Sequence, residues 1–417
     1  MSSLPESDRD FTKLSVPTVD RLAMEFIVRL GLALHAHGAH ALRVERALLA
    51  LSRRFGLEGQ FFALPTSLHV AFGALGEQTV FLVRTEPGDQ DLGKLAALDS
   101  LLVRTVGGLE LGTAREELAE LVSRRRRTPV ALELLAYAST AAGAAVFLGA
   151  GLRDIPIAAL LGLLCGSAVR ALGSRAETRV LSDAVASFAV ALCATIAASF
   201  LPGLAVGKLT LAGIISLLPG FSLTTAVNEI ATRHLASGTA RFAGACAVFL
   251  ALGFGTALGW RLGFGTAGMP APPNIVPAPD WAILGALVLT PAAFCVLLRV
   301  SRRDIGIVFL SCVVAWLGSR LGIRLLGPEL SALAGAITVG LFSNGVARVL
   351  DRPSSIPYVP GILLLVPGSL GFASLEALLA EDVVRGLHTA FRMMLVATSL
   401  VAGVLMANVL MPSRRVL

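Results

Sequence analysis

The chain has 417 residues, of which 55% are hydrophobic and only 15% charged, and its mean hydropathy is +0.77. A soluble globular protein carries about a quarter charged residues, so the composition excludes that class and indicates a polytopic membrane protein. The net charge of +7 lies mainly in short arginine groups beside apolar segments, a pattern that indicates membrane topology and gives no support to nucleic-acid binding.

The part of the chain before the apolar segments is predicted to hold a leader and one small domain. Residues 1–17 are polar and mixed in charge, so we expect a disordered leader without the apolar core of a signal peptide. Residues 18–128 are predicted to form a cytoplasmic α+β domain of ordinary size. Its expected elements are helices over 19–55 with a break at Gly38, strands at 61–64, 68–72 and 79–83, and helices at 91–105 and 112–123.

Three histidines in this domain raise the question of a metal site. His37 and His40 can share a helical face with Glu45 nearby, but His35 points elsewhere and no second ligand pair follows. We therefore predict no metal and no cofactor. The chain contains no P-loop, GxGxxG or nucleophile elbow, so we expect neither an ATP motor nor an enzyme. Its five cysteines lack CxxC spacing and are predicted to be free thiols.

Ten apolar segments follow the domain, each near the length of about 20 residues that a bilayer core requires. The arginines at 124–127 precede the first segment directly, which predicts a cytoplasmic N-terminus and, after ten spans, a cytoplasmic C-terminus with Arg414 and Arg415. The predicted spans are 131–150, 155–172, 180–201, 208–234, 239–260, 281–299, 304–322, 330–349, 357–378 and 385–411.

The membrane region is predicted to consist of two halves of five spans. A Pro/Gly-rich external linker at 263–280 separates residues 129–262 from residues 281–417. Asp154 and Asp304 begin similar short stretches in the two halves. Because each half has an odd number of spans, the halves must insert with opposite orientations. The fold class is therefore predicted to be a mostly α-helical inverted repeat, the architecture of many secondary transporters.

Two Pro-Gly pairs interrupt matching spans, Pro219-Gly220 in span four and Pro367-Gly368 in span nine. Proline removes a backbone donor and opens a helix, so a new half-helix with free amides is expected to begin after each break. Ser222 and Ser369 are predicted to lie at or near those N-termini as caps. Two such ends that meet at mid-membrane can bind a carboxylate, and the alternative is that both pairs only kink their helices for packing.

Glu229 is the carboxylate most strongly indicated as functional. It lies on one helical stripe with Ser222 and Thr225, and Asn228 precedes it. Within the membrane such a carboxylate could exchange a proton or bind the ammonium group of an amino acid. The alternative is a structural ion pair with Arg233 or Arg241 near the cytoplasmic face.

Other polar residues inside the spans are weaker candidates for the substrate or proton route. Asp183 in span three is followed one turn later by Ser187. In the second half, Asn344 with Arg348, and His388 with Arg392, are pairs four residues apart on one helix. His388 could relay protons, and its alternative role is packing near a helix end.

Several stretches together resemble the threonine/serine exporter (ThrE-like) family. The matching patterns are Gly38 followed by Arg43-Val44-Glu45, Pro219-Gly220 with Glu229 and then Ser237-Gly238-Thr239-Ala240-Arg241, and the double Pro-Gly run from Val359 to Ser369. The resemblance covers about residues 25–410. It implies export of small amino acids from the cytoplasm, driven by the proton motive force, across a bacterial inner membrane. The family usually carries Asp where this chain has Glu229, and the added methylene could alter substrate preference.

Two other functions stay open on the sequence. A C4 dicarboxylate exporter would need fixed cations, and Arg241 or Arg392 facing the cavity would supply them. A membrane-anchored hydrolase or sensor is the alternative of another class, although ten spans exceed what an anchor needs. The expected partners are a small amino acid, protons and the lipid bilayer, and the oligomeric state is not decided by the sequence, which is compatible with a homo-oligomer.

Overall fold

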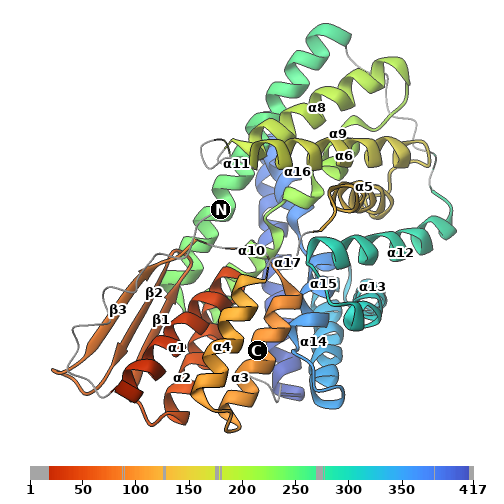
Figure 1. Ribbon diagram of the computed structural model, residues 1–417. Coiled ribbons are helices and arrows are strands. Elements are labelled where there is room, and N and C mark those ends of the chain that lie inside the picture. Colours follow the sequence, from red (N-terminus) through yellow and green to blue (C-terminus); the bar gives the residue numbers. More distant parts are fainter. Residues whose placement is uncertain are drawn as a thin grey trace.

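The computed structural model describes residues 18–86, 88, 90–124, 128–173, 178, 181–268, 276, 278–379 and 381–412. The predicted leader, residues 125–127 of the arginine run, the middle of the predicted linker, and Arg414 and Arg415 lie outside these residues. The described chain forms a small N-terminal domain and a larger bundle of helices, at the lower left and the right of Figure 1.

The N-terminal domain is a three-stranded sheet packed against four helices. Its strands pair antiparallel in the order β1-β2-β3, and every second residue of β2 (Leu68, Val70 and Phe72) is buried against the helices. The predicted elements are confirmed. Their bounds are α1 (Thr18–Ala36), α2 (Ala41–Arg54), β1 (Gly59–Leu64), β2 (Ser67–Phe72), β3 (Thr79–Arg84), α3 (Leu92–Val106) and α4 (Leu111–Ser123).

The described part of the bundle contains nine helices long and apolar enough to span a membrane, or ten when one bent pair is counted as a span. This confirms a polytopic membrane protein. The first half has α5 (Val130–Phe147), α6 (Asp154–Gly173), α8 (Ser182–Phe200), α9 (Val206–Gly213) with η2 (Ile215–Leu217) and α10 (Gly220–Ala231), and α11 (Leu235–Ala267). The second has α12 (Asp280–Leu297), η3 (Arg302–Asp304) with α13 (Ile305–Leu326), α14 (Ser331–Val349), α15 (Ser355–Leu365), α16 (Gly368–Leu379) and α17 (Val383–Leu410).

The same helix contacts occur in both halves. The second helix packs on the third and on the first part of the broken fourth, and the fifth packs on the third and on the second part of the fourth. The paired aspartates hold equivalent places. The Asp154 carboxylate accepts a hydrogen bond from the Ala205 amide just before α9, and the Asp304 carboxylate pairs with Arg352 (3.6 Å) just before α15.

The two broken helices cross at their breaks and run in opposite directions. A Cβ atom added to Gly220 would lie 3.2 Å from the Gly368 Cα atom and 2.1 Å from Val366 Cγ1. On one side of this crossing, the connection after α10 and the start of α15 both contact the N-terminal domain. On the other side, a Cβ atom on Gly207 at the start of α9 would lie 3.1 Å from Glu376 Oε1 near the end of α16.

The structure places neither of the two predicted capping serines at the residue before its half-helix. Pro219 occupies the N-cap position of α10 and no side chain caps that end, because the helix begins at Gly220 and Ser222 already lies in its first turn. Ser369 likewise lies inside α16, one residue after its start at Gly368.

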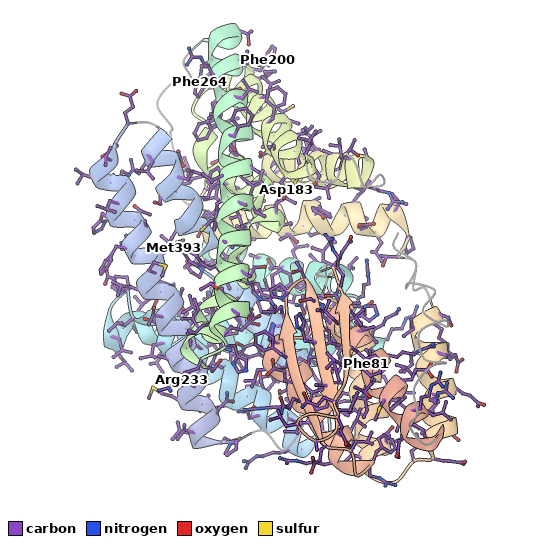
Figure 2. All side chains as sticks on the ribbon, turned by 90° about the vertical axis from the view of Figure 1, so that its left-hand side faces the viewer. Phe81, Asp183, Phe200, Arg233, Phe264 and Met393 are labelled. Atoms are coloured by element: carbon purple, nitrogen blue, oxygen red, sulfur yellow. The ribbon has the colours of Figure 1, made fainter. Side chains whose placement is uncertain are left out.

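The first part of the predicted linker is helical, since α11 continues to Ala267. Gly255, Gly259 and Gly263 recur every fourth residue on α11 and face α8. A Cβ atom on Gly263 would lie only 1.8 Å from Thr195 Oγ1. These glycines therefore serve close helix packing in the membrane instead of ending the helix. Figure 2 shows α11 running from the level of Arg233 to Phe264, next to Phe200 of α8.

Candidate functional site

The connection between α10 and α11 folds the chain back onto Glu229. Arg233 takes a positive φ of 67°, and the His234 amide donates to the Glu229 carbonyl oxygen (2.8 Å), which ends α10 in a tight turn. Gly238 then lies against α10, where a Cβ atom would be 2.9 Å from the Ala226 carbonyl oxygen. Because only glycine allows this approach, Ser237 and Arg241 on either side of it can reach the Glu229 carboxylate.

The Glu229 side chain is buried and fully engaged, with 1% of the residue exposed. Arg241 donates from Nε to Oε2 (3.1 Å) and from Nη2 to Oε1 (3.3 Å), and Ser237 Oγ donates to Oε2 (2.9 Å). A two-pronged guanidinium contact of this kind is strong and fixes the orientation of both groups. Of the two arginines considered as partners from the sequence, Arg241 makes the pair and Arg233 is exposed.

Glu229 also receives the N-terminus of a helix from the N-terminal domain. The Ala41 amide, first in α2, donates to Glu229 Oε1 (3.4 Å), while the N-cap residue His40 makes no side-chain cap of its own. Free amides at a helix start carry partial positive charge, so the carboxylate acts as a cap supplied by another domain. The turn that aims α2 at the membrane bundle depends on Gly38, whose φ is +89°.

Two further residues of this stretch contact the bundle. Arg43 Nη2 donates to Ser354 Oγ (3.4 Å), the N-cap residue of α15. Glu45 Oε2 lies 3.3 Å from His234 Nε2 in the turn after α10, and its Oε1 accepts from the Ala63 amide (2.9 Å). The N-terminal domain thus joins the end of one broken helix to the start of the other.

His40 lies at the centre of this interface. Its ring is 5.6 Å from that of Phe221, in the first turn of α10, and its Nδ1 atom is buried without a hydrogen bond from the described residues. Burial holds the pKa of His40 well below its usual 6.5, and the nearby Arg43 and Arg241 act in the same direction. Burial therefore favours the neutral form of His40 while the domain is docked.

We expect the docked N-terminal domain to loosen as the pH falls below the usual histidine pKa of 6.5. A detached domain would bind a proton at His40 there, whereas the docked form resists protonation, so acid favours detachment. Spin labels at Leu75 and Arg233, both exposed, would report a longer or broader distance distribution in acid. The variant His40→Phe keeps an aromatic ring against Phe221, and an undiminished acid response in it would contradict this assignment.

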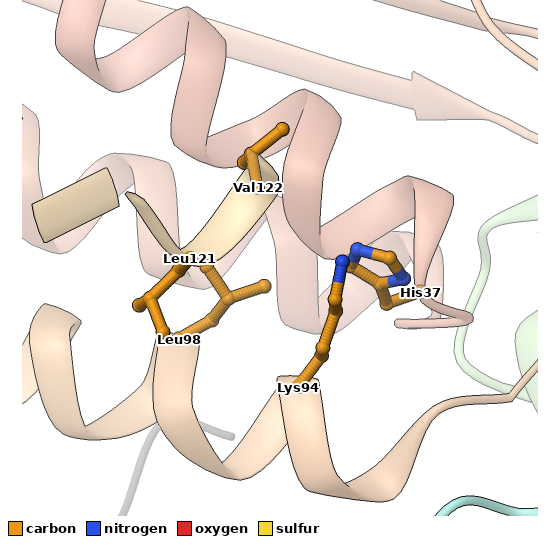
Figure 3. A pocket seen from close by; sticks show the side chains of 5 residues that line it. All are labelled: His37, Lys94, Leu98, Leu121 and Val122. Carbon is orange, nitrogen blue, oxygen red and sulfur yellow. The ribbon is translucent and has the colours of Figure 1, made fainter. Parts of the chain in front are cut away.

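The other two histidines of the predicted cluster point away from His40. His35 bonds through Nε2 to the Leu64 carbonyl oxygen (2.9 Å) and through Nδ1 to Thr85 (3.3 Å), inside the domain. His37 lines a small pocket together with Lys94, Leu98, Leu121 and Val122 (Figure 3). Burial lowers the pKa of both groups. This pocket belongs to the domain core. It lies apart from the Glu229 cluster, which consists of Glu229, Ser237, Arg241 and the Ala41 amide at the start of α2.

Among the described residues, no hydrogen bond joins the remaining candidates of the first half to the Glu229 carboxylate. Thr225 is buried and Ser222 and Asn228 half-buried on α10. Asp183 is half-buried in the first turn of α8, where Ser182 Oγ donates to it (3.4 Å), and Figure 2 shows it far along α11 from Arg233.

The candidates of the second half have different surroundings. Asn344 on α14 donates to Asn408 Oδ1 (2.9 Å) and to the Met411 carbonyl oxygen (2.7 Å), and Arg348 donates to the Pro412 carbonyl oxygen (2.7 Å). This pair fastens the C-terminal end of α17. His388 is exposed and Arg392 half-buried on α17, and neither joins the Glu229 cluster.

Several polar residues of this region and of its counterpart in α16 were not among the candidates from the sequence. Ser237 binds Glu229, eight residues before it, whereas His234 and Ser354 bind side chains that lie far from them in the chain, Glu45 and Arg43. Glu376 in α16 was also missed, although it stands 148 residues after the candidate Asn228, the spacing of the two Pro-Gly pairs. That spacing, applied to every polar residue of span four, would have found it.

The chain matches two family profiles in succession. Residues 25–263 match the family described as "Putative threonine/serine exporter", and residues 283–410 match "Threonine/Serine exporter, ThrE". No solved structure matches the chain.

Among curated proteins, the chain is similar to "Pheromone-regulated membrane protein 10" of Saccharomyces cerevisiae (strain YJM789), with 26% identity over 88% of this chain and 49% of that protein. The protein of the same name in Debaryomyces hansenii is 27% identical over 85% of this chain and 36% of its own length. The "Probable threonine/serine exporter" of Mycobacterium tuberculosis is 25% identical over 70% of this chain and 57% of its own. The chain thus spans about half or less of the yeast relatives' length. The two profile matches together run through both membrane halves and the N-terminal domain, and the chain belongs to the threonine/serine exporter family.

Proposed function

We propose that this protein is a secondary transporter that exports threonine, serine or a similar small amino acid from the cytoplasm, driven by the proton motive force. The observation that carries the proposal is the crossing of the two broken helices, where α10 begins at Gly220 and α16 begins at Gly368, side by side. Two helix N-termini that converge in a membrane provide backbone amides and partial positive charge for a substrate carboxylate.

The proposal includes an inverted repeat of the two membrane halves. It is supported by the matched helix contacts, the antiparallel run of the broken helices, and the equivalent places of Asp154 and Asp304. With the N-terminal domain in the cytoplasm of a bacterium, both ends of the chain lie on the cytoplasmic side of the inner membrane. The crossing would then separate a cytoplasmic from an external access route.

In this proposal Glu229 is the proton-binding or ammonium-binding group of the cytoplasmic route. Its present partners, Arg241, Ser237 and the α2 amide, hold it in a closed arrangement. Protonation would remove the charge that Arg241 and α2 bind, so the N-terminal domain would be released together with the carboxylate. The domain thus acts as a cytoplasmic gate, since it joins the turn after α10 to the start of α15.

The contacts of Arg241 favour an amino acid over a C4 dicarboxylate. A dicarboxylate would need a free fixed cation at the site, and the Arg241 guanidinium is bound to Glu229. An amino acid has a single carboxylate, and the backbone amides of the two helix starts at Gly220 and Gly368 can bind it without a fixed cation. The match to an exporter family supports transport over a hydrolase or a sensor.

Counterflow in proteoliposomes tests the function directly. We expect the full-length protein to exchange internal threonine or serine for the labelled amino acid, and to accumulate it against a gradient only when a pH difference is imposed. Liposomes without protein are the control, and succinate in place of the amino acid represents the dicarboxylate class. Exchange of succinate without exchange of threonine or serine would refute the amino-acid assignment.

A further inference from the structure

The corner between α16 and α17 repeats the geometry of the corner that holds Glu229. Helices α10 and α16 each have 12 residues, and the helices after them, α11 and α17, begin at positions that are also 148 residues apart. The glycine contact is repeated as well. A Cβ atom on Gly238 would lie 2.6 Å from Ile230 Cγ1, and one on Gly386 would lie 2.6 Å from Leu378 Cδ2.

Glu376 lies in the second corner one position before the place of Glu229 in the first, so its side chain is turned by about 100° around the helix axis. It occupies the position equivalent to Asn228, the residue before Glu229, and it is half-buried within a membrane span. Its Oε1 atom points to the start of α9, where a Cβ atom on Gly207 would lie 3.1 Å away. Unlike Glu229, its carboxylate has no hydrogen bond or ion pair with any residue that the structure describes.

The charged groups around Glu376 are few. Arg385 at the start of α17 has an electrostatic interaction with Glu376 but forms no ion pair with it among the described residues. Lys208 follows Gly207 in the chain, and its ammonium group donates to the Gly149 carbonyl oxygen (2.7 Å). The Asp154 carboxylate is held by the amides of Gly151 (2.7 Å) and Ala205. Helix α11 meets α16 through a stretch without ionisable side chains (247–259).

We propose that Glu376 is a second proton-binding site, reached from the side of the membrane opposite to Glu229. A charged carboxylate within a membrane span costs free energy unless a cation compensates it, so an unpaired one holds a proton while it is buried and can exchange that proton when water reaches it. The two carboxylates, on opposite sides of the helix crossing, are then the two ends of the proton route. This inference rests on the proposed exporter function.

The test compares proton-driven accumulation with plain exchange in proteoliposomes of the full-length protein. We expect Glu376→Gln to lose threonine accumulation driven by a pH difference while keeping threonine counterflow at equal pH. The uncoupling follows because the variant cannot carry a proton on that side. The matched control is Glu381→Gln, the same exchange at an exposed carboxylate in the connection before α17, which should keep both activities.

Three outcomes would overturn the assignment. They are proton-driven accumulation that survives in Glu376→Gln, loss of both activities in folded Glu376→Gln, and the same loss of accumulation in Glu381→Gln. Should Glu376→Gln fail to reconstitute, Glu376→Asp replaces it, with a shifted pH dependence of accumulation expected and an unchanged one contradicting the role. A wild-type protein without threonine or serine counterflow would instead refute the proposed function itself.

Discussion

We expect Glu229→Gln to reduce threonine export driven by a pH difference to the level of liposomes without protein. The amide cannot carry a proton, and it leaves the Arg241 guanidinium, whose side chain is only 20% exposed, without its counter-charge. Removing one partner of a buried ion pair costs about 3–5 kcal/mol, so the N-terminal domain should also dock more weakly. Accumulation assays, with spin-label distances between Leu75 and Arg233, measure both effects.

A matched control and a charge exchange distinguish proton binding by Glu229 from its ion pair with Arg241. Glu133→Gln removes a carboxylate that pairs with Arg170 (3.1 Å) on the bundle surface, and such exposed pairs contribute only about 0–1 kcal/mol, so export should persist. The double variant Glu229→Arg with Arg241→Glu restores an ion pair but moves the carboxylate to α11. Recovery of proton-driven export in the double variant would show that the carboxylate of this ion pair need not lie on α10.

The membrane helices could be predicted from the sequence because the bilayer imposes their length. Span six was expected at 281–299 and α12 runs from Asp280 to Leu297, and every other predicted span except the fifth ends within four residues of its helices. Hydropathy alone predicts the positions of these helices, since an apolar stretch of about 20 residues matches the thickness of the bilayer core. Within α11 the same reasoning failed at Gly263, because glycine was taken as a breaker where it permits contact with Thr195.

The docking of the N-terminal domain could not be predicted from local patterns. The Ala41 amide and the Glu229 carboxylate are 188 residues apart in the chain, and no sequence pattern at either residue predicts contact with the other. The resemblance to the exporter family marked both stretches but did not say that they touch. Only the folded chain shows that Arg43 and Glu45 hold the two broken helices on one side.

Glu376 escaped the sequence reasoning for a different reason. The two halves are only weakly similar, and the carboxylates are displaced by one position relative to the Pro-Gly pairs. Helix boundaries recover the relation because α10 and α16 have the same length and the same glycine contact after them. The helix boundaries thus support the proposed repeat of the two halves at positions where the side chains differ.

We expect Gly220→Ala to destabilise the protein and stop transport, because it inserts a methyl group into the helix crossing. The new Cβ atom would lie 2.1 Å from Val366 Cγ1 and 3.2 Å from the Gly368 backbone, so the two breaks must move apart. Overpacking of this kind costs about 1–3 kcal/mol, and here it also displaces both helix starts from the proposed substrate site. Thermal unfolding in detergent and threonine counterflow measure the two consequences.

A control variant and a rescue variant are both expected to change stability in the direction opposite to Gly220→Ala. Gly244 on α11 has open space around its Cα, so Gly244→Ala should be neutral or stabilising, since alanine favours a helix over glycine by about 1 kcal/mol. Adding Val366→Ala to Gly220→Ala removes the atom in closest conflict and should recover part of the lost stability. If Gly220→Ala proves as stable and active as Gly244→Ala, the two breaks do not pack together in the membrane. If the double variant shows no coupling between the two positions, the contact at the crossing is not the cause of the loss.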